Sequence, residues 1–279
     1  MSKEHKIAII GIGHWGKNLL AELEKQVEVK YKCDNKTDLN VVFSDPEIEA
    51  VFVATPTKTH FEVAKKVITA GKHLFLEKPG TSSSSELAEI VEMARAKNLV
   101  FAVGYEFPHH PAIQKIKELI AGHQIIGMAF EWNKWGTFEN DAVPHLLSHD
   151  ISVAKYLGLQ NITPVFHHRT KVISESDITI TKFLGENNEE IVSYINRTSG
   201  TAEKSATIIT DKDIFIISGN KLFKVNQENR ELEQIEIDTT SPVANEIKDF
   251  LTALENEKTP KMNGDFALAV YKTIESVKI

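Results

Sequence analysis

The glycine pattern of residues 11–16, which reads G-I-G-H-W-G, constrains the fold of this chain more than any other segment. It follows the apolar run Ile7–Ile10, and the segment after it has helical periodicity. A strand, a glycine turn and a helix in this order are typical of dinucleotide binding. Gly11 permits the tight turn, Gly13 lets a pyrophosphate approach, and Gly16 lets helix and strand pack closely. The helix start then offers free N–H groups to the phosphates. The alternative is a turn of the same shape that binds no ligand.

The second expected strand ends at an acidic residue. Residues 27–33 alternate and lead to Asp34, about twenty positions beyond the glycines. A carboxylate at this place can accept hydrogen bonds from an adenosine ribose and would repel a 2′-phosphate, so the sequence favours NAD over NADP. Two observations leave this open: Lys32 and Lys36 could turn toward a phosphate, and Asp34 could be an ordinary turn residue.

Composition and charge restrict the class of protein. The 279 residues are enough for two domains, and 42% apolar with 25% charged residues is ordinary for a globular protein. A net charge of −7 argues against a nucleic-acid binder. The single cysteine, Cys33, excludes an internal disulfide and is expected to be buried and inert. The first residues show no signal-peptide pattern and no segment has transmembrane length, so we expect a cytoplasmic protein without a membrane partner.

The first part of the chain alternates expected strands and helices. This alternation implies a parallel, doubly wound sheet, and so an N-terminal Rossmann domain, which we place at residues 1–121. Between Asp34 and Ala50 there is room for only a turn or two of helix, so we expect an open adenine side. Ser82–Ser85 is expected to cap the helix after it. The expected strands are 7–10, 27–33, 50–54, 72–76 and 99–104, and the expected helices are 17–23, 59–70, 86–97 and 111–120.

After Gly122 short alternating strands dominate, which favours a largely antiparallel sheet. We therefore expect residues 122–279 to form an α+β domain with a large, mostly antiparallel open sheet. One helix is expected inside it, and two closing helices are expected to pack back on the first domain. The expected strands are 128–132, 165–173, 178–184, 190–196, 206–210, 213–218 and 221–225, and the expected helices are 143–157, 242–256 and 266–277.

Several motifs together resemble one enzyme family. Residues 77–79 read E-K-P after A-G-K-H at 70–73, and residues 54–60 read A-T-P-T-K-T-H. This combination resembles the glucose–fructose oxidoreductase/inositol dehydrogenase (Gfo/Idh/MocA) family over essentially the whole chain, including Ala244–Asn263. The segments 13–19, 103–107 with 111–113, and 149–152 are similar to one branch. Members of that branch oxidise nucleotide-activated sugars, typically amino-sugar derivatives.

The resemblance implies a chemistry for two residues. A sugar C–OH group would give a hydride to nicotinamide and a proton to a base. Lys78 of the E-K-P motif would lie beside both the nicotinamide and the reacting hydroxyl, with Pro79 in the cis form, and His149 matches the family's second catalytic residue. The position of Lys78 agrees, since it follows a parallel strand at the edge where such sheets bind ligands. The alternative is a surface cation beside a turn.

The residue four positions before His149 departs from the family pattern. The family has an aspartate there, and this chain has His145. An Asp–His pair at this spacing can orient and polarise the imidazole, whereas two imidazolium charges repel each other. Either His145 is a substitute polar contact or the proton relay has changed. The two histidines also have metal-ligand spacing, but no spacing selects a third ligand, so no metal is expected. The histidines that could supply a third ligand are His109, His110, His167 and His168.

These interpretations assign residues to three roles. The catalytic residues are expected to be Lys78, His149 and His145. The substrate contacts are expected to be Tyr105, Trp132, Lys134 and His149, where the aromatic rings could instead belong to the core. The cofactor contacts are expected to be Gly11, Gly13, His14, Trp15, Gly16, Asp34, Thr55, Pro56, His60, Glu77 and Lys78.

The expected function is that of an NAD-dependent oxidoreductase acting on a sugar hydroxyl, preferably of a nucleotide-activated sugar. A free-sugar or polyol dehydrogenase of the inositol dehydrogenase type is the first alternative. A reductase of a non-sugar double bond, as in the biliverdin reductases, and a non-catalytic nucleotide-binding regulator are the others, and His145 favours the regulator. The resemblance also implies a homodimer or homotetramer formed through the open sheet, whose exposed apolar face would seek a partner.

Overall fold

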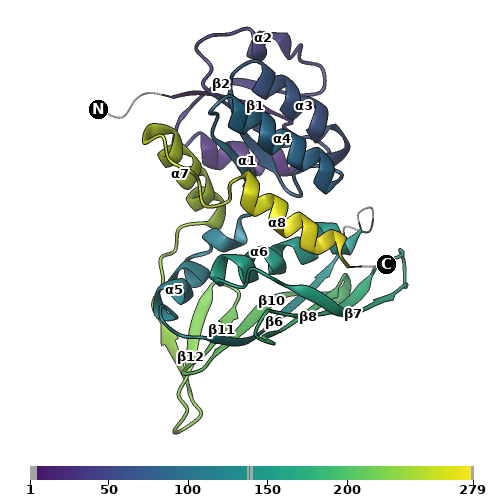
Figure 1. Ribbon diagram of the computed structural model, residues 1–279, viewed down its shortest axis with the longest axis vertical. Helices are drawn as coiled ribbons and strands as arrows, with labels where there is room; N and C mark the ends of the chain where they lie inside the picture. Colours follow the sequence, from purple (N-terminus) through teal and green to yellow (C-terminus); the bar gives the residue numbers. More distant parts are fainter. Residues whose placement is uncertain (1–4, 137, 139–140, 278–279) are drawn as a thin grey trace. The chain divides into compact units, whose positions relative to one another are not determined.

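The computed structural model describes residues 5–136, 138 and 141–277 (Figure 1). The first four residues, on which part of the expectation about a leader segment rests, lie outside this range. The chain forms two compact units: residues 1–106 with 242–271, and residues 107–241 with 272–279. Each unit has its own sheet.

The first unit contains a five-stranded parallel sheet in the order β2-β1-β3-β4-β5. The chain moves one way across the sheet from β1 to β2 and the other way from β3 to β5, so right-handed crossovers place the helices on both faces. This is the doubly wound parallel sheet that the alternating pattern predicts. Its strands are β1 (Lys6–Ile10), β2 (Glu28–Cys33), β3 (Ala50–Val53), β4 (His73–Glu77) and β5 (Phe101–Gly104).

The helices of this unit follow the sequence pattern closely. The short connection after β2 contains a single helical turn, α2, as the spacing predicts. The Ser83 side chain caps α4 by accepting a hydrogen bond from the Glu86 N–H at 3.2 Å, as expected for the serine run. The helices are α1 (His14–Leu23), α2 (Asn40–Phe43), α3 (Thr57–Thr69), α4 (Ser84–Ala96) and α7 (Pro242–Glu255), and α8 (Gly264–Glu275) begins here.

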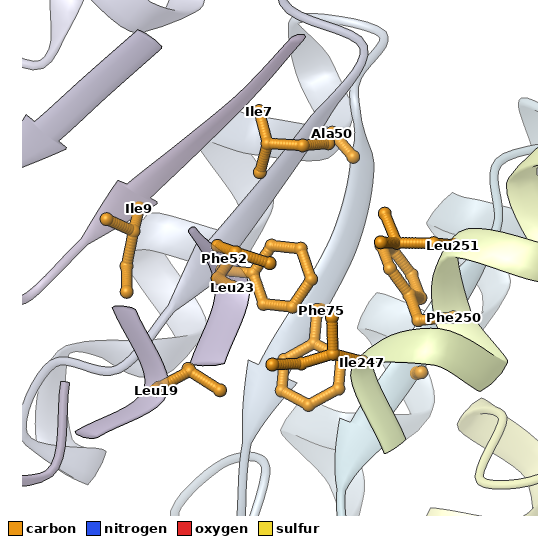
Figure 2. Close-up of a cluster of buried hydrophobic side chains, with 11 residues drawn as sticks. Ile7, Ile9, Leu19, Leu23, Ala50, Phe52, Phe75, Ile247, Phe250 and Leu251 are labelled. Carbon is orange, nitrogen blue, oxygen red and sulfur yellow. The ribbon is translucent and has the colours of Figure 1, made fainter. Parts of the chain in front are cut away.

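The closing helix α7 is part of the core of this first unit. Phe250 of α7 meets Phe52 and Phe75 edge to face, at 5.3 and 5.6 Å between ring centroids, and those two rings stack at 4.6 Å. Figure 2 shows Ile247 and Leu251 of the same helix in this cluster. Truncating a buried phenylalanine such as Phe250 to alanine typically costs about 3–5 kcal/mol, so α7 stabilises the sheet that carries the glycine turn.

The second unit contains an eight-stranded sheet in the order β13-β12-β11-β10-β6-β9-β8-β7. All neighbours are antiparallel except β6 and β9, so the mostly antiparallel sheet is confirmed. Its strands are β6 (Ile125–Trp135), β7 (Thr163–Thr170), β8 (Ile178–Leu184), β9 (Glu190–Asn196), β10 (Thr198–Thr210), β11 (Ile214–Ser218), β12 (Lys221–Val225) and β13 (Leu232–Ile235). Its other elements are η1 (Phe107–His109), α5 (Pro111–Leu119), η2 (Val143–Leu147) and α6 (Ser148–Leu157).

Three local expectations for this unit are corrected. The strand expected over 165–173 ends at Thr170, because the Asp177 carboxylate accepts the N–H groups of residues 172–174 and folds them into a turn. The helix expected from residue 143 begins with a π-helical turn and becomes α-helical only at Ser148. The strand β13 was not expected, since its sequence lacks an apolar run. Within the described parts of the chain, no helix is both long and apolar enough to span a bilayer.

Candidate active site

The glycine turn after β1 has the shape that the motif predicts. Gly11 has φ +100°, and a Cβ atom there would lie 2.6 Å from the carbonyl carbon of Ala54. A Cβ atom at Gly16 would lie 1.8 Å from the carbonyl oxygen of Gly11, so the helix could not approach the turn with a larger residue. At Gly13, by contrast, a Cβ atom would meet nothing within 4 Å. Backbone atoms therefore pack tightly against Gly11 and Gly16, whereas the middle glycine, Gly13, has open space around it.

The start of α1 adds uncapped backbone N–H groups to this turn. The helix begins at His14, directly after Gly13, and none of the described side chains caps it. His14 and Trp15 are exposed in its first turn. The sheet order changes direction between β1 and β3, and ligands of doubly wound sheets bind outside the strand ends at such a switch point. The open turn, the uncapped helix start and the switch point coincide here.

Asp34 follows β2 at the same edge of the sheet. Its Oδ1 accepts hydrogen bonds from the Lys36 N–H at 3.0 Å and from the Thr37 Oγ1 at 2.9 Å. These bonds, that of Lys36 first, lower the pKa of the exposed carboxyl group, so it stays anionic. Asp34 is thus a turn residue and a fixed negative charge at once. Lys32 is held in an ion pair with Glu24.

The loop after β3 is braced by His60. The imidazole is buried, and its two nitrogens contact the carbonyl oxygens of Thr55 at 2.6 Å and Gly80 at 2.9 Å. Burial lowers the pKa of His60, although both carbonyls oppose this. The Thr55 hydroxyl accepts a hydrogen bond from Thr59 at 2.9 Å, and Pro56 directly precedes α3. His60 therefore ties the loop after β3 to the loop after β4.

Glu77 and Lys78 stand at the end of β4. The Lys78–Pro79 peptide bond is cis. The buried Glu77 carboxyl accepts a hydrogen bond from the Trp15 indole N–H at 2.6 Å and another from the Lys78 N–H at 3.2 Å. Burial, with a smaller contribution from the nearby Glu106, raises the pKa of Glu77 to about 7, and the Trp15 bond and the Lys78 charge oppose this shift. The indole joins the glycine turn directly to the strand end that carries Lys78.

Two further carboxyl groups of this unit were missed by sequence reasoning. Glu106 follows β5, and Glu246 lies on α7 with only 3% of its surface exposed. Glu77 and Glu106 both act electrostatically on Glu246, and each raises its pKa after the larger effect of burial. The sequence did hold a signal, because Glu246 falls beside Ile247 on the apolar face of an otherwise amphipathic helix.

In the second unit, aromatic rings hold His149. The imidazole is buried on α6 and stacks on the Trp132 ring of β6, with centroids 5.3 Å apart and planes at 30°. The Phe107 ring meets it edge to face at 4.5 Å. His145 is half-buried in the π-helical turn, where its N–H donates to the Asp141 carbonyl at 3.3 Å. Packing against rings thus fixes the imidazole of His149.

Two charged groups of this unit, Asp150 and Lys204, were not among the expected site residues. Asp150 is fully enclosed and accepts a hydrogen bond from the Ser193 hydroxyl at 2.6 Å. Burial raises its pKa to about 6, while Lys204 and the Ser193 bond oppose the shift. The Lys204 ammonium lies 4.1 Å from the Trp132 ring centroid and also contacts the Phe107 ring. Lys204 pairs with Trp132 across β10 and β6, a register that the sequence alone does not reveal.

The remaining candidate residues have simpler surroundings. Tyr105 is fully buried in the first unit, with its ring edge to face on Phe266 at 6.3 Å, so it belongs to the core there. Lys134 is half-buried on β6, two residues after Trp132 and so on the same face. The described residues contain no group of three histidine, cysteine, aspartate or glutamate side chains that could hold a metal ion.

Comparison with known proteins finds a family match within the first unit. Residues 21–105 match the Gfo/Idh/MocA family, described as an oxidoreductase family with an NAD-binding Rossmann fold. This segment is therefore similar to the Gfo/Idh/MocA oxidoreductases. The match covers the strands from β2 to β5, with Asp34, Thr55, His60, Glu77 and Lys78.

Characterised relatives act on sugars or activated sugars. The chain is 30% identical over 129 residues to UDP-N-acetylglucosamine 3-dehydrogenase of Acidithiobacillus ferrooxidans, covering 40% of this chain and 41% of that protein. It is 32% identical over 96 residues to dTDP-3,4-didehydro-2,6-dideoxy-alpha-D-glucose 3-reductase of Saccharopolyspora spinosa, covering 34% and 29%. The levoglucosan dehydrogenase of Pseudarthrobacter phenanthrenivorans is 31% identical over 100 residues, covering 36% and 26%. The matches therefore span less than half the length of these relatives.

Solved structures share the whole fold. The Acidithiobacillus ferrooxidans UDP-N-acetylglucosamine 3-dehydrogenase GnnA superposes with a TM-score of 0.89 at 20% identity, over 98% of this chain and 96% of that one. An oxidoreductase from Agrobacterium radiobacter, solved with NAD+, L-tartaric acid and magnesium, gives 0.86 at 15% identity, over 98% and 95%. At these identities the likeness establishes the fold of both units.

Proposed function

We propose that this chain is an NAD-dependent oxidoreductase that transfers a hydride between a sugar hydroxyl, preferably of a nucleotide-activated sugar, and nicotinamide. One observation carries the proposal. The Trp15 indole of the glycine turn bonds at 2.6 Å to Glu77, the residue before Lys78, so the dinucleotide turn and the reactive lysine share one edge of the sheet. A hydride-transfer enzyme needs a proton-transferring group at this edge, beside the nicotinamide half of its cofactor.

The order of the strands orients the dinucleotide. With the pyrophosphate at the turn after β1, Asp34 after β2 lies on one side and Lys78 after β4 on the other. In this arrangement Asp34 would hold the adenosine ribose, and Lys78 would act at the nicotinamide half. Because the Asp34 carboxyl group stays charged, a 2′-phosphate would meet repulsion, and we assign NAD in preference to NADP.

The proposed reaction assigns separate roles to Lys78, His149 and His145. NAD supplies the hydride acceptor when it is bound. The Nζ of Lys78 takes the proton of the reacting hydroxyl, and the cis bond to Pro79 is part of the turn from which the lysine projects. We assign His149 a contact with the substrate, as the family resemblance implies, and its ring is held by Trp132 and Phe107. These rings supply the orientation that an aspartate at position 145 would otherwise give, and His145 is assigned a polar contact beside them.

The second unit supplies the substrate contacts in this proposal. The half-buried Trp132 ring has the Lys204 ammonium over it, and Lys134 adds a second cation on the same strand face. A sugar ring that carries a diphosphate combines an apolar face with negative charge, which such a surface suits. The relatives named as UDP- and dTDP-sugar enzymes point to the same class of substrate.

A turnover panel tests the proposal. The purified protein is incubated with NAD+ and, in separate reactions, UDP- and dTDP-activated hexoses, free hexoses and inositol, and the absorbance of reduced nicotinamide is followed. Reduction with a nucleotide sugar that exceeds reduction with the free sugar supports the proposal. Reduction only with free sugars or polyols favours the inositol dehydrogenase type. Binding of NAD without reduction by any compound would favour a regulatory relative.

A further inference from the structure

Glu246 is an unusual carboxyl group within the first unit. It is 3% exposed on α7, and neither carboxyl oxygen has a hydrogen-bond partner among the residues that the structure describes. A buried carboxylate without partners is strongly disfavoured relative to the neutral acid. The burial and the missing partners therefore favour the protonated form of Glu246.

The groups that act on Glu246 come from the ends of two strands. Glu77, at the end of β4, and Glu106, just after β5, both repel a negative charge on it. Glu77 in turn interacts with the Lys78 ammonium and with the Trp15 indole, and its own pKa is raised to about 7. Three carboxyl groups thus share one environment in which adding a negative charge to any member disfavours ionisation of the others.

This group of three, Glu77, Glu106 and Glu246, lies on the nicotinamide side of the site. The glycine turn follows β1, and β4 and β5 stand on the side of β1 away from β2 and Asp34. A dinucleotide whose ribose is held by Asp34 would have its nicotinamide half on the side of Glu77 and Glu106, which lie at the ends of β4 and β5. The oxidised ring is a cation, and the reduced ring is neutral.

We propose that Glu246 is a proton-holding residue that releases its proton when the oxidised dinucleotide binds and keeps it when the reduced dinucleotide binds. The inference rests on the proposed function, because it needs the dinucleotide in this site. On oxidation of the sugar, the C–H hydride passes to nicotinamide, and the O–H proton passes to Lys78, which takes it as a neutral amine after losing its own proton to solvent. The ring loses its charge in that step, so the carboxyl groups regain their affinity for a proton. The proton lost by the sugar then has an acceptor in the same unit, through the neighbouring Lys78 and Glu77.

Affinity measurements against pH test this inference. NAD+ and NADH are titrated separately into the protein by calorimetry at a series of pH values between 5.5 and 9. The affinity for NAD+ is expected to rise with pH, by up to about tenfold per unit for one linked proton, and that for NADH to stay nearly level. Glu246→Gln, which imitates the protonated acid, is expected to flatten the NAD+ curve.

Asp249→Asn is the matched control. Asp249 lies about one turn further along α7, and its pKa is likewise raised by burial. Unlike Glu246, it accepts a hydrogen bond from the Lys261 N–H at 2.8 Å, and the Lys261 charge opposes the shift. This variant is expected to keep the slope of the unmodified protein. An unchanged NAD+ slope in Glu246→Gln, or equal slopes for NAD+ and NADH, would overturn the inference.

A stability measurement without nucleotide tests the inference about Glu246 separately from the proposed function. A buried acid whose pKa is raised binds more protons in the folded state, so stability falls as pH rises from the unfolded pKa toward the folded pKa. The urea midpoint of Glu246→Gln is therefore expected to exceed that of the unmodified protein at pH 8 and to approach it at about pH 4, near the unfolded value. A constant difference would show that Glu246 holds no such proton. Failure of either nucleotide to bind at any pH would instead refute the proposed function.

Discussion

The hydrogen bond from the Trp15 indole to Glu77 gives the sharpest structural prediction. The bond is 2.6 Å long and ends on a carboxyl group that is 5% exposed, so replacing the donor leaves a buried acceptor without it. Such a loss costs about 1–3 kcal/mol, and because the indole itself is partly exposed we expect Trp15→Phe to lose about 1–2 kcal/mol of unfolding free energy. The same loss raises the pKa of Glu77 above its value of about 7, because the indole bond is what lowers it most.

The pH dependence of this loss is the decisive readout. An indole N–H bonds a carboxylate more strongly than a neutral acid, so the cost of Trp15→Phe should be larger at pH 8.5 than at pH 5.5, on either side of the Glu77 pKa of about 7. Urea unfolding followed by far-ultraviolet circular dichroism measures it, since tryptophan fluorescence would be altered by the substitution. Glu77→Gln in a double-mutant cycle isolates the pair. Equal losses at the two pH values, or an interaction energy of zero, would refute the assigned geometry.

Three further predictions concern the nucleotide turn, the choice of cofactor and assembly. Gly16→Ala should abolish nucleotide binding and lower the thermal midpoint, because its Cβ atom would lie 1.8 Å from the Gly11 carbonyl oxygen; tight binding by a folded variant would contradict this. NAD should bind more tightly than NADP, and in Asp34→Ala the dissociation constants of the two nucleotides should become more similar. Equal affinities for NAD and NADP in the unmodified protein would contradict the assignment of Asp34 to the ribose. The second unit exposes Phe166, with 53% of its surface accessible, and Ile126, also 53%, so light scattering at micromolar concentration should show a dimer or tetramer, and a monomer would contradict the expected assembly.

The fold of the first unit was readable from the sequence because its strands are buried on both faces. Each strand appears as an apolar run, and glycines or serines mark the turns between strands and helices. Gly11 and Gly16 could be assigned because backbone contacts leave no room for a side chain, and this constraint is local. The one-turn helix α2 followed from chain length alone.

What the sequence did not reveal depends on long-range packing. Lys204 lies over the Trp132 ring because β10 pairs with β6 in one register. Hydrophobic periodicity cannot select the register between two strands that lie 60 or more residues apart in the chain. Glu246 becomes significant only because α7 packs back on the first sheet beside Glu77. No residue composition distinguishes a π-helical turn from an α-helical one, so the sequence did not predict the turn at His145. This turn changes the α-helical spacing that would place His145 and His149 on one helix face.

Turnover and NAD+ binding measured together in Lys78→Ala test the central claim most directly. The Gly11–Gly16 turn holds the pyrophosphate in this account, so the dissociation constant for NAD+ should change little. The rate of nicotinamide reduction with the best nucleotide sugar should fall by on the order of a hundred- to ten-thousand-fold, because a group that transfers the proton is removed. Full turnover in Lys78→Ala, or a loss of NAD+ binding equal to the loss of rate, would contradict the account.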